Sequence, residues 1–286
     1  MRFGAHSQMF VHDIAENPAE TVRTVADIGL DAIEIDVRLP EAFPVAEVRR
    51  ALDETDIDLV LGVALPAERN TISDDADVRR AGVDHLRRSI RLAETLGARK
   101  VGGGLHSANG VFAGRGRTAQ EWDRSVDALR AVAPEAQDAG ITLTVEPVSR
   151  YSGYFLNTAD DAIALVEEVD SPNVRVQLDT WHMNIEESDT PRAIRRVGPL
   201  LGHVHAVESN RGVPGTGQVP WTEVLRALRD VGYDDLLVYE HFPVGLPVMA
   251  ARTHTWRDLG GSREVCIEGT RALRAELEKI EEKSNV

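Results

Sequence analysis

The segment from residue 140 to residue 179 contains GITLTVE (140–146) and NVRVQLD (173–179), two short apolar runs that each end on a carboxylate. Helix-like sequence, with apolar residues every three or four positions, separates them. Apolar runs of this length are typical of parallel strands that are buried on both faces. The segment therefore predicts a strand–helix–strand unit of a parallel sheet.

The same alternation continues in both directions to the ends of the chain. We predict eight strands, at Arg2–Ser7, Ala32–Asp36, Ile57–Val63, Lys100–Gly104, Ile141–Glu146, Val174–Asp179, Leu201–Val207 and Leu236–Glu240. The helical period is clearest at Val78–Leu96, Ala119–Asp138 and Arg263–Lys279. Eight strand–helix units without a linker predict one domain over residues 1–286, a single (β/α)8 TIM barrel of the α/β class.

The competing fold is a doubly wound parallel sheet. That fold favours a glycine-rich turn after the first strand, where a nucleotide phosphate binds. Here the first strand leads into HSQMFVHD (6–13), which contains no glycine. The sequence therefore favours the barrel.

Composition excludes several classes of protein. The 286 residues are 42% hydrophobic and 28% charged, which is typical of a globular protein, and the net charge of −15 argues against a nucleic-acid partner. No uncharged apolar run reaches the roughly 18 residues needed to span a membrane, and the N-terminus lacks the apolar core of a signal peptide. A single cysteine, Cys266, allows no intrachain disulfide. We therefore expect a cytoplasmic protein with no membrane partner.

Four successive predicted strands end on metal-binding side chains. Active sites of such barrels lie at the C-terminal ends of the strands, so these side chains should meet at one mouth. Clustered charges there would repel one another unless a cation or protons neutralised them. Three carboxylates and one imidazole suit an octahedral ion, with Mn²⁺ expected first and Co²⁺ or Mg²⁺ as alternatives. The predicted ligands are Glu146, Asp179, His205 and Glu240.

At these segments the sequence resembles a known family, the ketose 3-epimerases of the D-tagatose and D-allulose 3-epimerase branch of the xylose-isomerase-like barrels. The matching stretches are VEPVSRYSGYFLNT (145–158), QLDTWHMNIEE (177–187), HVHAVESNRGVPGTGQVPW (203–221) and the segment from YEHF (239–242) to WRDL (256–259). The resemblance covers most of the chain. It implies a small-molecule sugar substrate and a homodimer or homotetramer.

The resemblance also implies roles for individual residues. Glu146 and Glu240 would bind the metal and act as the acid and base that move the proton at C3 of a ketose through a metal-bound enediolate. His182 and Arg211 match substrate-binding positions, and a cationic donor there would help to hold the enediolate oxygen. Glu208 could orient His205 or Arg211.

Two further residues are predicted to contact the substrate. His106, in GGGLHSANG (102–110), follows the fourth strand and should face the same mouth. Ser152 stands where the family commonly has a glutamate that holds one end of the sugar, in Ser-Arg-Tyr-Ser (149–152) instead of a sequence like Asn-Arg-Phe-Glu. The resemblance therefore implies a substrate that differs at that end.

Other functions remain open at the level of sequence. The same enediolate can expel a substituent, so a lyase or dehydratase that acts on a 3-keto-glycoside or an inosose is the main alternative. A barrel related to abasic-site endonucleases would need more histidine ligands for zinc and less negative charge. A non-catalytic binding subunit would not need an intact set of metal ligands.

Overall fold

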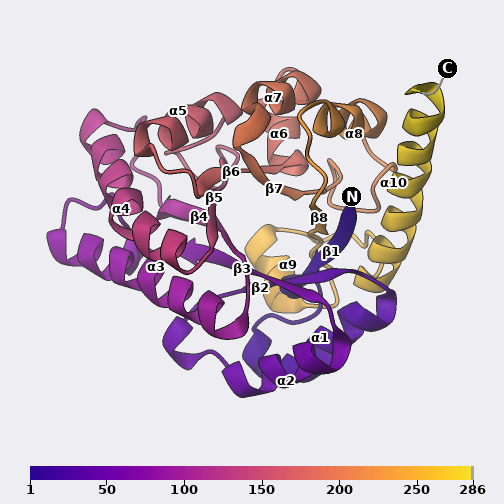
Figure 1. Cartoon of the computed structure of the whole chain (residues 1–286), viewed down its shortest axis with the longest axis horizontal. Coiled ribbons are helices and arrows are strands. Elements are labelled where there is room, and N and C mark those ends of the chain that lie inside the picture. Colours follow the sequence, from indigo (N-terminus) through magenta and orange to yellow (C-terminus); the bar gives the residue numbers. More distant parts are fainter. Residues whose placement is uncertain (285–286) are drawn as a thin grey trace.

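The computed structural model describes residues 1–284. Eight strands pair in parallel and in chain order, and the first also pairs with the last, so the sheet closes into a barrel at the centre of the molecule (Figure 1). The strands are β1 Arg2–His6, β2 Ala32–Asp36, β3 Asp58–Leu65, β4 Lys100–Ala108, β5 Thr142–Val145, β6 Val174–Asp179, β7 Leu201–His205 and β8 Leu236–Tyr239. The predicted (β/α)8 barrel is confirmed.

Helices surround the barrel in the order of the chain (Figure 1). They are α1 Pro18–Ile28, α2 Val45–Thr55, α3 Ala76–Leu96, α4 Ala119–Asp138, α5 Ala159–Val169, α6 Thr180–Glu186, α7 Thr190–Val197, α8 Trp221–Asp230, α9 Pro247–Thr253 and α10 Ser262–Ser284. Short 3-10 turns occupy Ser7–Met9, Ile14–Glu16, Pro40–Ala42, Ala67–Arg69 and Gly198–Leu200. The additional helix α6 follows β6 directly, and the additional helix α9 follows β8 after residues 240–246. Both lie on the side of the barrel where the predicted site lies.

Local sequence explains where the long helices begin and end. Thr118 caps α4 by accepting the N–H of Glu121, and the Glu121 carboxylate accepts the N–H of Thr118 in return. Helix α3 ends at Gly97, which adopts a left-handed conformation with φ of 80°.

Strand β2 shows how the barrel separates its two faces. Ile33 and Ile35 belong to the large core between the strands and the helices, whereas Ala32 lies on the opposite face in a small apolar cluster with Val60, Leu236 and Val238. Side chains alternate along a strand, so Glu34 shares the inner face with Ala32. The carboxylate of Glu34 thus lies inside the barrel, next to this apolar cluster on the side toward the C-terminal ends of the strands.

Strand ends differ from the predicted ones by a few residues. Strand β4 continues to Ala108, beyond the predicted end at Gly104, because it stays paired with β3 across a shift in register. Strands β5 and β8 stop one residue earlier than predicted, so Glu146 and Glu240 are the first residues after their strands. Both carboxylates still lie at the C-terminal mouth of the barrel.

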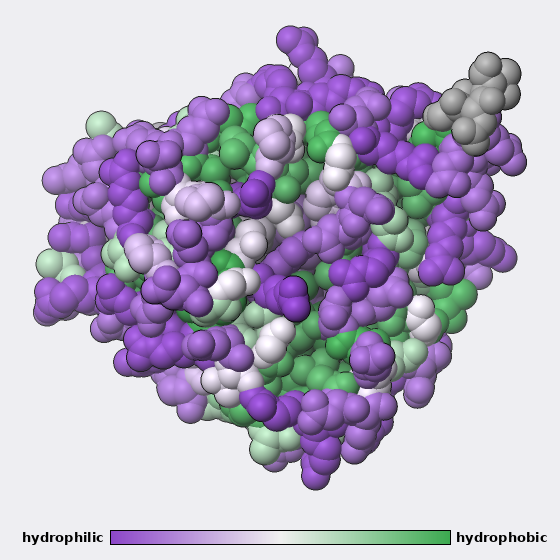
Figure 2. All heavy atoms as spheres, in the orientation of Figure 1, coloured by the Kyte–Doolittle hydropathy of each residue, from purple (hydrophilic) through white to green (hydrophobic). Residues whose placement is uncertain are grey.

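The outer surface is mostly polar. Figure 2 shows hydrophilic side chains over the peripheral helices, with apolar side chains visible mainly toward the middle of this face. Within residues 1–284, no helix has both the length and the apolar character needed to cross a membrane.

Candidate metal centre and active site

The four predicted metal ligands converge at the mouth of the barrel. Nδ1 of His205 lies 3.6 Å from Oε1 of Glu146 and 4.0 Å from Oδ2 of Asp179. One ligand atom from each of Asp179, His205 and Glu240 can be chosen so that all three atoms lie within 4.8 Å of one another, and the same holds for Glu146, Asp179 and His182. Neighbouring parallel strands that end at one rim produce this convergence.

Two buried atoms in this cluster have no hydrogen-bond partner within the described residues. They are Oδ2 of Asp179 and Nδ1 of His205. Buried polar atoms are nearly always paired, so unpaired acceptors that face one another fit a bound cation. The oxygen-rich donor set with one imidazole suits a hard divalent ion.

The electrostatics of the cluster also favour a cation. Burial, together with the nearby carboxylates of Asp179 and Glu240, raises the pKa of Glu146 to about 8. Burial likewise raises the pKa of Asp179 to about 6. Glu240 differs, because the guanidinium of Arg211 overcomes the effect of burial and holds its pKa below the usual range. Two of the three acids thus resist ionisation unless positive charge is supplied.

Arg211 reaches into the cluster from the loop after β7. Its guanidinium forms an ion pair with Glu240 and lies 3.7 Å from Oδ2 of Asp179. It also lies over the ring of Trp181, with 4.2 Å from the guanidinium carbon to the ring centroid. Its backbone has a φ of 60°, a left-handed conformation that is uncommon outside glycine. The loop is therefore shaped to direct this cation at the carboxylates.

Glu208 maintains the shape of that loop. Its buried carboxylate accepts hydrogen bonds from the backbone N–H groups of Ser209, Gly215 and Val219 and from the indole N–H of Trp221. These bonds use its acceptor positions, and none of them goes to the side chain of His205 or Arg211. A role of Glu208 in orienting His205 or Arg211 stays a prediction, and with these partners the carboxylate would act through the backbone of the loop.

His182 is placed to donate a hydrogen bond to a ligand. Its Nδ1 accepts the backbone N–H of Ser149 at 2.9 Å, which leaves Nε2 as the protonated nitrogen of the neutral ring. Burial and the charge of Arg211 lower its pKa to about 3, so the ring is neutral. His182 lines a cavity of about 820 Å³ at the barrel mouth, together with His205, Arg211 and Glu240.

Of the other two residues predicted to contact the substrate, Ser152 and His106, only one lines this cavity. Ser152 does. His106 does not: it is buried, its Nε2 donates to the backbone carbonyl of Glu146 at 3.0 Å, and its Nδ1 contacts the hydroxyl of Ser107 at 2.8 Å. Both ring nitrogens of His106 therefore bind protein atoms, and the ring supports the segment that carries Glu146.

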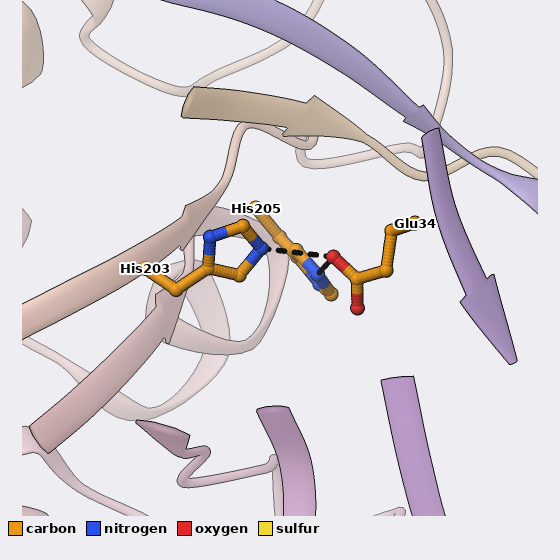
Figure 3. A group of neighbouring side chains, drawn as sticks. All are labelled: Glu34, His203 and His205. Carbon is orange, nitrogen blue, oxygen red and sulfur yellow. Dashed lines mark hydrogen bonds and ion pairs between the residues drawn. The ribbon is translucent and has the colours of Figure 1, made fainter. Parts of the chain in front are cut away.

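One charged residue of the site was not predicted from the sequence. Glu34, on the inner face of β2, accepts a hydrogen bond from Nε2 of His203 at 2.8 Å and from Nε2 of His205 at 3.0 Å (Figure 3). The signal that was available is a glutamate at the centre of the apolar strand AIEID (32–36). The rule that active-site side chains lie at strand ends does not include Glu34, because Glu34 lies two residues before the end of its strand.

A closed parallel barrel with charged side chains gathered at its C-terminal mouth is the arrangement of a TIM-barrel enzyme. The xylose isomerase-like TIM-barrel family matches residues 22–260, and the chain belongs to this family.

Within that family the chain is similar to ketose 3-epimerases. It is 35% identical to D-psicose 3-epimerase of Agrobacterium fabrum over 93% of each chain, and 34% identical to L-ribulose 3-epimerase of Mesorhizobium japonicum over 95% of this chain and 92% of that one. A solved structure of an L-ribulose 3-epimerase superposes with a TM-score of 0.92 at 33% identity, covering 99% of this chain and 97% of the other. The protein is therefore an enzyme of the epimerase type, and the predicted resemblance is confirmed.

Proposed function

We propose that the protein is a divalent-metal-dependent epimerase that inverts C3 of a free ketose. The observation that carries this proposal is the convergence of Glu146 and Glu240 on Asp179 and His205 at the mouth of the barrel, in a chain similar to ketose 3-epimerases. Glu146 and Glu240 directly follow two different strands, β5 and β8, so they can approach a bound sugar from different sides. Epimerisation needs one proton-transfer group on each face of the carbon.

In this mechanism one carboxylate removes the proton from C3 as the electron pair moves into the C2–C3 bond and onto O2. The other carboxylate then returns a proton to C3 from the opposite face, so no atom is gained or lost. Glu146, Asp179, His205 and Glu240 would hold a divalent ion, which would supply positive charge to polarise the C2 carbonyl and stabilise the enediolate. The Nε2–H of His182 and the guanidinium of Arg211 direct donors toward the same oxygen.

The proposal includes Mn²⁺ as the ion, a homodimer or homotetramer as the assembly, and the cytoplasm as the location. The donor set supports Mn²⁺, and the resemblance to the family supports the assembly. Metal analysis of the purified protein and light scattering test the first two, and fractionation of cells tests the third.

Turnover in D₂O tests the reaction itself. Metal-loaded protein is incubated with a panel of ketohexoses, ketopentoses and 3-keto-glycosides, and the products are analysed by NMR. A C3 epimerase incorporates deuterium at C3 as the second epimer accumulates. Products that have lost a substituent would instead identify a lyase and overturn the proposal.

Replacing Arg211 with alanine should lower kcat by about 10²-fold, because its guanidinium would stabilise the enediolate oxygen of the substrate. The metal should stay bound, because a guanidinium has no lone pair with which to ligate it. Steady-state kinetics and metal content are measured on the same preparation. Arg226→Ala, on the outer helix α8, is the matched control. Loss of metal in Arg211→Ala, or an unchanged rate, would contradict this role.

Ser152→Glu should shift preference toward D-tagatose and D-allulose. The introduced carboxylate can accept a hydrogen bond from a terminal hydroxyl of such sugars, a contact of about 1 to 3 kcal/mol. The measurement is kcat/KM of both proteins over the panel, and we expect the wild-type protein to act weakly on these two sugars. If D-tagatose or D-allulose is already the best substrate and the variant changes nothing, Ser152 does not determine specificity.

A further inference from the structure

Glu34 occupies an unusual position for a carboxylate. It is 1% exposed, it lies inside the barrel, and no lysine or arginine of the described chain forms a hydrogen bond or ion pair with it. Its partners are the imidazoles of His203 and His205 (Figure 3). A buried charge of this kind costs stability compared with a well-packed apolar side chain. Its presence therefore calls for a role other than packing.

The geometry links Glu34 to the metal centre through one ring. A carboxylate can only accept hydrogen bonds, so its contact with His205 holds the proton on Nε2. The other nitrogen, Nδ1, is the one that faces Glu146 and Asp179 and has no hydrogen-bond partner. The lone pair that a metal needs is thus directed at the carboxylate cluster when the ring is neutral.

His203 restrains the carboxylate in turn. It precedes His205 by two residues on β7, so both rings lie on the inner face of the barrel, 5.3 Å apart between centroids. Its Nε2 lies 2.8 Å from the same Oε2 atom of Glu34 that contacts His205. Two donors on one oxygen define the orientation of the carboxylate from two directions.

Gly62 on β3 leaves the space that Glu34 occupies. A Cβ atom at this position would lie 2.9 Å from Oε1 of Glu34 and 3.3 Å from Nε2 of His6. The carboxylate would have to move to relieve that contact. A methyl group at residue 62 therefore displaces Glu34 without changing its charge.

We propose that Glu34 is a positioning residue that holds His205 with Nδ1 directed at the metal, and that His203 and Gly62 keep Glu34 in place. This inference rests on the proposed function, because it assigns Glu34 a role only through the metal ligand. Partners that orient a ligating histidine typically change metal affinity by about 10- to 100-fold when they are removed.

The experiment compares Mn²⁺ affinity by isothermal titration calorimetry in the wild type, Glu34→Gln, Glu34→Ala and Gly62→Ala. Glutamine keeps an acceptor for Nε2–H but loses the charge, whereas alanine loses both, so affinity should fall in the order wild type, Gln, Ala, to about 100-fold for Ala. Gly62→Ala should weaken binding although Glu34 is unchanged. Glu121→Gln removes a buried carboxylate at the start of α4 and should bind Mn²⁺ like the wild type.

Two further measurements separate positioning from a purely structural role. Metal-free thermal unfolding should show that Glu34→Gln still unfolds cooperatively like the wild type, because glutamine keeps the size of the side chain and an acceptor oxygen for both imidazoles. In Zn²⁺-loaded protein, nitrogen-15 NMR of His205 should show metal on Nδ1 and a proton on Nε2, and in Glu34→Ala this signature should weaken.

Each remaining outcome has a defined meaning. Equal Mn²⁺ affinity in all variants, with an intact wild-type site, overturns the role of Glu34 and leaves the proposed function standing. A second ion per chain that is lost in Glu34→Ala would make Glu34, His203 and His205 a separate metal site and would also overturn it. If the wild type binds no divalent ion, the proposed function itself fails.

Discussion

Removal of divalent metal is expected to abolish turnover, and Mn²⁺ or Co²⁺ is expected to restore it. Three carboxylates converge at the mouth of the barrel, and without a cation two of them have a raised pKa. Activity is measured after chelation, with the residual metal content determined on the same sample and Ca²⁺ added back as a control. Full activity in a preparation verified to be free of metal would contradict the proposed mechanism.

The same centre predicts how metal binding depends on pH. In the metal-free protein the pKa of Glu146 is raised to about 8, so the group holds a proton at pH 7, and a metal must displace it. Affinity should therefore rise with pH as Glu146 loses its proton, and also as His205 does, because the carboxylate of Glu34 raises the pKa of that imidazole. The same shift means that Glu146 favours the folded metal-free protein below its unfolded pKa and that this contribution is lost as pH rises toward 8.

Replacement of either Glu146 or Glu240 by glutamine is expected to lower kcat by several orders of magnitude. Each substitution removes one proton-transfer group and one negatively charged ligand together. Steady-state kinetics are paired with metal content at saturating Mn²⁺, so that lost chemistry can be distinguished from lost metal. Glu223→Gln, an exposed position on α8, serves as the control.

Deuterium exchange tests the role of each carboxylate separately. If each carboxylate serves one face of C3, a variant that retains only one of them should still exchange deuterium into one epimer while it fails to form the other. Near-normal epimerisation by either variant would overturn the mechanism with two carboxylates.

The positions of the ligands were predictable because parallel strands deliver their C-terminal ends to one rim. Asp179 and His205 end their strands, Glu146 and Glu240 follow theirs directly, and the cluster forms whatever the detailed packing. The same reasoning places His106 at the mouth, and the structure shows its ring buried with both nitrogens against protein atoms. The longer β4 and the bonds to Glu146 and Ser107 turn that ring into the protein.

The sequence by itself determined the barrel, the four side chains at its mouth and the family, because these depend on local patterns and on the direction of the strands. Only the tertiary structure decided the partners of those side chains. Glu34 and His205 are 171 residues apart and meet across the inside of the barrel, and Glu208 is satisfied by a loop whose backbone conformation no pattern specifies. Contacts of this kind depend on how closely non-adjacent strands and loops approach one another, which is set by the packing of the whole chain.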